Sequence, residues 1–104
     1  LYLSGLKSDF VLPTTDAGVT DVYHIFAVRH PERDRLRQYL LENGVKTEIH
    51  YPVPPHRQKA MQGILDQGHY PLAEEIHQTI LSLPCSFGNT EAEIEQVIDI
   101  MNRF

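Results

Sequence analysis

The sequence contains one cysteine, Cys85, and no apolar stretch long enough to cross a lipid bilayer. A single cysteine cannot form an internal disulfide, and its place after the apolar run at 81–84 is typical of a small buried hydrophobic residue. A signal peptide is also absent from the sequence, because no charged flank is followed by a long apolar core. These absences lead us to expect a soluble, cytoplasmic protein without a membrane segment.

Basic residues are few: 9 Lys and Arg stand against 14 Asp and Glu, for a net charge of −5. A general nucleic-acid-binding domain collects basic residues on one face, so we expect no nucleic-acid partner. Between Lys46 and Lys59, however, three basic residues and one acidic residue give +2, which leaves −7 for the rest of the chain. The charge distribution therefore leaves an anionic ligand near this segment open.

The length allows one small domain. A chain of 104 residues buries only about 60–65% of its unfolded surface, so we expect modest stability without a partner. The sequence does not begin with Met, which favours a piece of a longer protein. We find no internal repeat and no low-complexity tract.

Six histidines raise the question of a metal site. Five, twelve and seven residues separate His50, His56, His69 and His77, which matches no zinc-binding spacing, and no cysteine pair supports one. We therefore predict no metal. His24 falls on one face of an apolar run and is interpreted as a core histidine, while His30, His69 and His77 are interpreted as loop, cap or surface residues.

The most informative segment is GVKTEIHYPVPPHRQ at residues 44–58. Apolar and polar residues alternate from Val45 to Tyr51, which predicts a strand on which His50 and Tyr51 point to opposite sides. Three prolines at 52, 54 and 55 then keep the chain extended and hold His56 on a stiff arm. Taken alone, this pattern also fits a strand that ends in a proline-rich surface loop.

The other elements alternate along the chain. Residues 22–29 carry apolar side chains on both faces, which predicts a central strand covered on both sides. A helix from Pro31 to Asn43, closed by Gly44, joins it to the strand at 45–51 as a β-α-β unit. A short helix is predicted at 56–65, weakened by a glycine.

Two further helices complete the prediction. One begins near Pro71, with a core stripe at residues 72, 73, 76 and 80, and leads into an extended piece at 81–84. The last runs from Glu91 to Arg103, begins with a capping box of Thr90 and Glu93, and buries residues 94, 97, 98 and 101. Residues 1–21 read as an incoming segment or linker, and residues 22–104 as the domain. The predicted fold is α/β (α+β), a small sheet with helices packed on it.

Three ordered pieces carry a family resemblance. Residues 44–58 resemble the pattern Gly-Ile/Val-x-Thr-x-x-His-Tyr-Pro-x-Pro-x-His-x-Gln of the DegT/DnrJ/EryC1/StrS family of pyridoxal-phosphate-dependent sugar aminotransferases. The runs VYHIFAVR at 22–29 and LSLP at 81–84 resemble two other segments of that family in order and spacing. The resemblance covers roughly residues 22–104 and implies the C-terminal small domain of a fold-type I aminotransferase.

The resemblance also implies that the cofactor lysine and the substrate-contacting residues of this chain lie in different domains. The full-length enzyme uses pyridoxal phosphate, but Lys7, Lys46 and Lys59 do not resemble the family's Schiff-base lysine, which belongs to a large N-terminal domain absent from this chain. We therefore expect this chain alone to bind no cofactor and to be inactive. The positions that match the substrate-contacting part of the motif are His50, Tyr51, His56, Arg57 and Gln58.

The implied function is amino transfer, usually from glutamate, to a keto nucleotide sugar by a homodimeric enzyme, for instance in polysaccharide biosynthesis. The motif looks most like members that act on dTDP-linked 3-keto-6-deoxyhexoses, although some relatives use the same framework for dehydration. Two alternatives stay open. One is a stand-alone small-molecule-binding or regulatory module without catalysis, and the other is a purely structural interaction domain.

Overall fold

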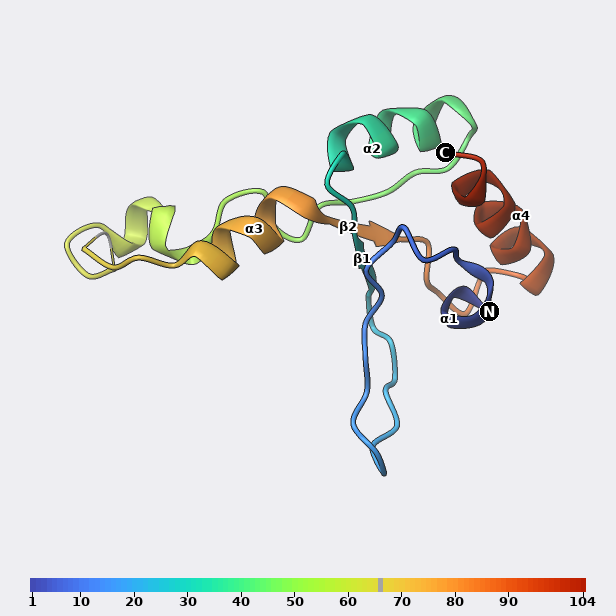
Figure 1. Ribbon diagram of the computed structural model, residues 1–104, viewed down its shortest axis with the longest axis horizontal. Helices are drawn as coiled ribbons and strands as arrows, with labels where there is room; N and C mark the ends of the chain where they lie inside the picture. Colours follow the sequence, from blue (N-terminus) through green and yellow to red (C-terminus); the bar gives the residue numbers. More distant parts are fainter. Residues whose placement is uncertain (66) are drawn as a thin grey trace.

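The computed structural model describes residues 1–65 and 67–104 (Figure 1). Four helices, two strands and two 3-10 turns make up the described part of the chain. In sequence order these are α1 (Tyr2–Gly5), β1 (Phe26–Arg29), α2 (Arg33–Glu42), η1 (Pro55–Arg57), η2 (Lys59–Met61), α3 (Pro71–Thr79), β2 (Ile80–Leu83) and α4 (Glu91–Asn102). None of the helices in these residues has the length and apolar character needed to cross a membrane.

The sheet consists of two antiparallel strands with Phe26 opposite Leu83 and Arg29 opposite Ile80. Each strand gains a single bridge on its outer edge, from Val11 to Arg29 and from Glu48 to Ser82. Because the segment at Glu48 and β1 both run antiparallel to β2, they run parallel to each other with β2 between them. The predicted small sheet with helices packed on it is confirmed.

The core lies where the sheet meets α2 and α4, which Figure 1 shows above and beside it. Val28, Leu36, Leu40, Leu81 and Met101 are completely buried there. The capping box of α4 is present, since Thr90 Oγ1 accepts from the Glu93 amide at 3.3 Å and Glu93 Oε2 accepts from the Thr90 amide at 2.8 Å. Gly44 closes α2 with φ of +81°, a conformation in which glycine carries no steric penalty.

The first residues of the chain pack into this core. Tyr2 and Phe10 are buried, and the Tyr2 hydroxyl donates to the carbonyl of Pro84 at 2.9 Å. Burial, with a smaller effect of Cys85, raises the pKa of Tyr2, which keeps the hydroxyl protonated as a donor. The Asn102 side chain donates to the Gly5 carbonyl at 2.8 Å and accepts from the Lys7 amide at 2.9 Å. Residues 1–10 are thus joined to the end of α4 and to the segment after β2.

Three predictions near β1 and β2 are wrong. The strand predicted at 22–29 begins only at Phe26, because Tyr23 has a positive φ of 44° that interrupts the extended backbone. His24 lies before the strand and is exposed, so it is not a core histidine. Cys85 is exposed as well, since β2 ends at Leu83, and its thiol donates to the Tyr23 carbonyl at 3.2 Å.

Three further corrections concern the middle of the chain. The strand predicted at 45–51 is an extended segment in which only Glu48 pairs with the sheet, because β2 offers just the amide and carbonyl of Ser82 on that edge. The helix predicted at 56–65 is replaced by η1 and η2, which are separated by the extended backbone of Gln58. Leu72, placed on the core stripe of α3, is 64% exposed.

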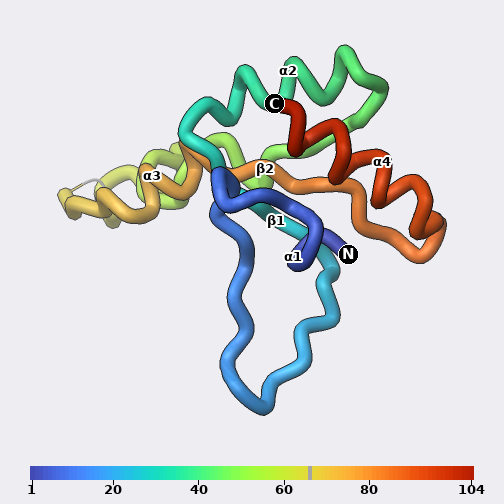
Figure 2. The backbone as a smooth tube through the Cα atoms, turned by 45° about the vertical axis from the view of Figure 1, so that its right-hand side comes forward, coloured from blue at the N-terminus to red at the C-terminus, as the bar shows by residue number. Residues whose placement is uncertain are grey.

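Two projections leave the packed body, a loop at about residues 12–25 and an arm formed by residues 51–65 and 67–72 (Figure 2). The radius of gyration is 15.5 Å, whereas a compact chain of this length has about 13 Å. Much of the exposed apolar surface lies on these projections, on Val19, Val22, Tyr51, Val53, Ile64, Tyr70 and Leu72. The chain thus presents apolar surface that its own core does not cover.

Candidate functional site

The five residues predicted to contact substrate form two groups. His50 and Tyr51 lie where the chain leaves the sheet, while His56 and Arg57 lie on η1 against α3. The side chain of Gln58 donates to the Val53 carbonyl at 3.4 Å and is exposed.

His50 is anchored to the sheet. Its Nδ1 lies 2.9 Å from the hydroxyl oxygen of Ser82 on β2. The half-buried imidazole forms part of the wall of a cavity of about 240 Å³, together with His24, Lys46, Glu48, Ser82 and Cys85 among others. The walls come from three segments far apart in the chain, namely the approach to β1, the segment at Glu48, and β2 with the residues after it. The cavity therefore offers two imidazoles, an amine and a carboxylate to a polar ligand.

Tyr51 lies beside His50 instead of across from it. The two rings are 5.3 Å apart and nearly perpendicular, which excludes the opposite orientations predicted from alternation. Alternation holds only in an extended chain, and the backbone bends at His50. The Tyr51 carbonyl accepts a hydrogen bond from His77 Nδ1 on α3, and its side chain is 64% exposed. The phenol is consequently free to meet a ligand.

His56 and Arg57 converge on one carboxylate oxygen of Glu74, in the first turn of α3. The distances to Glu74 Oε1 are 3.0 Å from His56 Nε2, 3.0 Å from Arg57 Nε and 2.7 Å from a terminal nitrogen of Arg57. Tyr70 covers the imidazole, with ring centroids 4.9 Å apart, and only 9% of the His56 side chain is exposed. The Arg57 side chain remains 63% exposed. Glu74 thus holds η1 against α3 and orients the Arg57 guanidinium.

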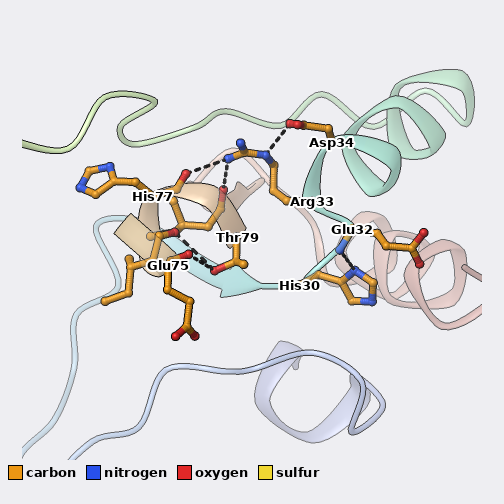
Figure 3. A network of polar contacts seen from close by, with 9 residues as sticks. His30, Glu32, Arg33, Asp34, Glu75, His77 and Thr79 are labelled. Carbon is orange, nitrogen blue, oxygen red and sulfur yellow. Dashed lines mark hydrogen bonds and ion pairs between the residues drawn. The ribbon is translucent and has the colours of Figure 1, made fainter. Parts of the chain in front are cut away.

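A buried arginine secures the other end of α3. Figure 3 shows Arg33, from the start of α2, directed at the last turn of α3, where it donates to the carbonyls of Ile80 at 3.0 Å and His77 at 3.3 Å. The guanidinium also pairs with Asp34 at 2.6 Å. A second cavity of about 200 Å³ lies here, with Arg33, Arg57, Glu74 and His77 in its walls. Since the cavity at His50 has none of these residues in its walls, the predicted site does not form one pocket in this chain.

Sequence reasoning missed Ser82, Glu74 and His24 as members of the site. Ser82 and Glu74 are 32 and 18 residues from the histidines they contact. Nothing in the local sequence pattern predicts contacts between residues so far apart.

The lysines do not form a pyridoxal-phosphate cradle. Lys7 pairs with Asp9 at 3.1 Å, and Lys46 and Lys59 are exposed. A Schiff-base lysine needs an enclosed site with a carboxylate for the pyridine nitrogen and donors for the phosphate. Lys46 lines the cavity at His50 together with Glu48, but it is exposed to solvent, so none of the three lysines lies in an enclosed site and these residues do not fit the cofactor by themselves. Within residues 1–65 and 67–104, no group of three His, Cys, Asp or Glu side chains is arranged to hold a metal ion.

The contacts of Glu74 predict a pH dependence. Hydrogen bonds from His56, and next from Arg57, lower the pKa of the Glu74 carboxyl. A carboxyl with a lower pKa in the folded state stabilises that state above its unfolded pKa of about 4.3. That contribution disappears as the pH falls through the lower folded value. We expect the Arg57 Nε–H and His56 ring signals to move together in an NMR titration to acid pH, as this carboxyl is protonated below the range of an ordinary glutamate.

Two variants test this assignment. Glu74→Gln removes the carboxylate, so both signals shift at neutral pH and the acid step disappears. Glu75→Gln is the matched control, because Glu75 is the next residue on the same helix and pairs with Arg29 at 3.2 Å instead. An acid step that survives in Glu74→Gln but is lost in Glu75→Gln would show that the wrong carboxylate has been assigned.

Comparison with known proteins shows that the family similarity extends beyond the motif at residues 44–58. A sequence profile of the DegT/DnrJ/EryC1/StrS aminotransferase family matches residues 2–102. A dTDP-3-amino-3,6-dideoxy-alpha-D-galactopyranose transaminase from Aneurinibacillus thermoaerophilus is 40% identical over 104 residues, which are 99% of this chain and 28% of that protein.

Two solved structures are similar in fold. DesV from S. venezuelae, crystallised in complex with a ketimine intermediate, is 37% identical with a TM-score of 0.91, over 98% of this chain and 28% of that one. NtdA from Bacillus subtilis, with bound cofactor PMP, is 25% identical with a TM-score of 0.84, over 98% of this chain and 25% of that one. The chain thus spans only about a quarter of the length of these relatives. On the match over residues 2–102, the chain belongs to the DegT/DnrJ/EryC1/StrS aminotransferase family.

Proposed function

We propose that this chain is the C-terminal small domain of a pyridoxal-phosphate-dependent aminotransferase that acts on a keto nucleotide sugar. One observation carries the proposal: nearly the whole chain matches 28% of a transaminase named for a dTDP-linked amino sugar. The substrate class we propose is a dTDP-linked 3-keto-6-deoxyhexose. We further propose that the whole protein has a large N-terminal domain and acts as a cytoplasmic homodimer.

Each part of the protein has its own task in this proposal. The cofactor supplies the electron sink for amino transfer, and its lysine belongs to the large domain, because no lysine of this chain has suitable surroundings. This chain binds and orients the sugar nucleotide. The His50 imidazole and the Tyr51 phenol can exchange hydrogen bonds with sugar hydroxyls. Arg57, fixed by Glu74 but largely exposed, can donate to the diphosphate.

The two projections support a larger assembly. Val22 on the loop is almost fully exposed, and the arm carries further exposed apolar residues. Several exposed apolar side chains on extended segments are what we expect where another part of a protein covers them. We propose that the large domain or the second subunit covers it.

The test compares this chain with the whole protein that carries it. Mixed with pyridoxal phosphate, the 104-residue chain should form no saturable, borohydride-trappable adduct and should transfer no amino group. The whole protein should transfer the amino group of glutamate to a dTDP-linked 3-keto-6-deoxyhexose. Product can be followed by mass spectrometry with ¹⁵N-labelled glutamate.

Two outcomes would contradict the proposal. Turnover by the chain alone, with an adduct on Lys46 or Lys59, would move the catalytic lysine into this domain. A reading frame that encodes only this domain and binds a small molecule as a stable unit would favour the regulatory-module alternative.

A further inference from the structure

The imidazole of His50 depends on one side chain for its orientation. Within residues 1–65 and 67–104, the hydroxyl of Ser82 makes the only side-chain hydrogen bond to it, at 2.9 Å from Nδ1. Ser82 itself is 5% exposed and lies at the centre of β2, between Leu81 and Leu83. A buried hydroxyl in an apolar strand is unfavourable unless it is hydrogen-bonded, and His50 provides that partner.

The backbone of Ser82 also fixes the segment that carries His50. The Ser82 amide donates to the Glu48 carbonyl at 2.8 Å, and the Glu48 amide donates to the Ser82 carbonyl at 3.2 Å. This pair of bonds places the chain two residues before His50, and the hydroxyl then places the ring. One residue of β2 therefore fixes both the position and the rotation of the imidazole.

The chemistry of a hydroxyl suits this task. A serine hydroxyl donates to an unprotonated Nδ1 and accepts from a protonated one, so it can serve either tautomer and the imidazolium. In each case Nε2 is the ring nitrogen left for a ligand at the cavity that His50 and Ser82 both line. Ring orientation set by a neighbouring hydrogen bond is a recurring feature of functional histidines.

We propose that Ser82 is a positioning residue, whose hydroxyl holds the His50 imidazole so that Nε2 meets a hydroxyl or keto oxygen of the sugar. The inference rests on the proposed function for the identity of the ligand. It makes the LSLP segment part of the substrate site through a side chain that acts by orienting His50.

The first experiment reads the ring directly and requires no activity. In the whole protein, ¹⁵N NMR of His50 gives the populations of the two ring tautomers. Ser82→Ala should change these populations, because it removes the hydrogen-bond partner of Nδ1. Thr47→Val is the matched control, because it also removes a buried hydroxyl next to Glu48, but Thr47 Oγ1 has no hydrogen-bond partner among the described residues. The His50 signals should be the same in this control as in the parent protein.

The second experiment is a double-mutant cycle on the sugar half-reaction. Ser82→Ala should lower kcat/KM for the sugar nucleotide about 2- to 12-fold, the effect of one neutral hydrogen bond, mainly through KM. In a His50→Ala background the same change should have less than about a 2-fold effect, because the ring it orients is gone. The glutamate half-reaction should be unaffected in every variant.

The outcomes separate the two hypotheses. Unchanged His50 signals in Ser82→Ala, or equal effects of Ser82→Ala with and without His50, would overturn the positioning role, whatever the enzyme acts on. If the signals change while His50→Ala leaves amino transfer intact, the assignment of His50 to the substrate site is wrong, and the role of Ser82 in the reaction is overturned with it.

Discussion

Replacing His50 with Ala, or Tyr51 with Phe, in the whole protein should lower kcat/KM for the sugar nucleotide about 2- to 150-fold. The range follows from the loss of one hydrogen bond, at about 0.5–1.5 kcal/mol for neutral partners and up to about 3 kcal/mol for a charged one. His50 is held by Ser82 and the Tyr51 carbonyl by His77, so the imidazole and the backbone that carries the phenol are in place before the substrate binds. Such preorganisation makes their loss costly.

Single-turnover measurements of the two half-reactions check this prediction. The glutamate half-reaction should change little, because it needs no contact with the sugar. His69→Ala is the control, since His69 is an exposed histidine outside both cavities. Unchanged sugar half-reactions in His50→Ala and Tyr51→Phe, and also in His56→Ala, would make the segment a structural loop, even with the family correct.

Tyr2→Ala should lower the free energy of unfolding by about 3–5 kcal/mol, the usual cost of removing a large buried aromatic side chain. The ring is 7% exposed and lies 4.9 Å from the Phe26 ring. Its hydroxyl binds the Pro84 carbonyl, 82 residues away in sequence. Tyr2→Phe should cost only about 0.5–1.5 kcal/mol, because it loses the hydrogen bond and keeps the packing.

Urea unfolding followed by circular dichroism measures these differences. Leu3→Ala serves as the neighbouring control, since Leu3 is 50% exposed and an exposed substitution usually changes stability by less than about 0.5 kcal/mol. A Tyr2→Ala variant as stable as Leu3→Ala would mean that residues 1–21 are only an incoming segment. If Tyr2→Ala is less stable than Leu3→Ala, as we expect, the first turn of the chain belongs to the domain.

Features that depend on neighbours in sequence were predictable. The capping box of Thr90 and Glu93 and the buried stripe behind it lie within four turns of one helix, so spacing alone locates α4. Gly44 marks the end of α2 for a similar reason, because only its own backbone conformation is involved. The family motif could also be recognised from the sequence alone, since it consists of consecutive residues.

The predictions that are wrong concern segments in which tertiary contacts override the local sequence pattern. Alternation from Val45 to Tyr51 is that of a strand, but the length of an edge strand is decided by how many free amides and carbonyls its neighbour offers. Here only Ser82 pairs with the segment. The apolar residues next to Cys85 and His24 predict that both side chains are buried. Both are exposed, because they lie just outside β2 and β1, whose ends no local sequence pattern marks.

The amino-acid sequence by itself determined three of the helices and the fold class, because these follow from local spacing, and it indicated the family and the motif residues through the resemblance of three ordered segments. Only the tertiary structure decided which partners the motif residues have. His50 meets Ser82, and His56 and Arg57 meet Glu74, because β2 and α3 return beside the motif at sequence separations of 17 to 32 residues. Such contacts depend on strand register and helix placement, which are properties of the packed chain and not of any short segment.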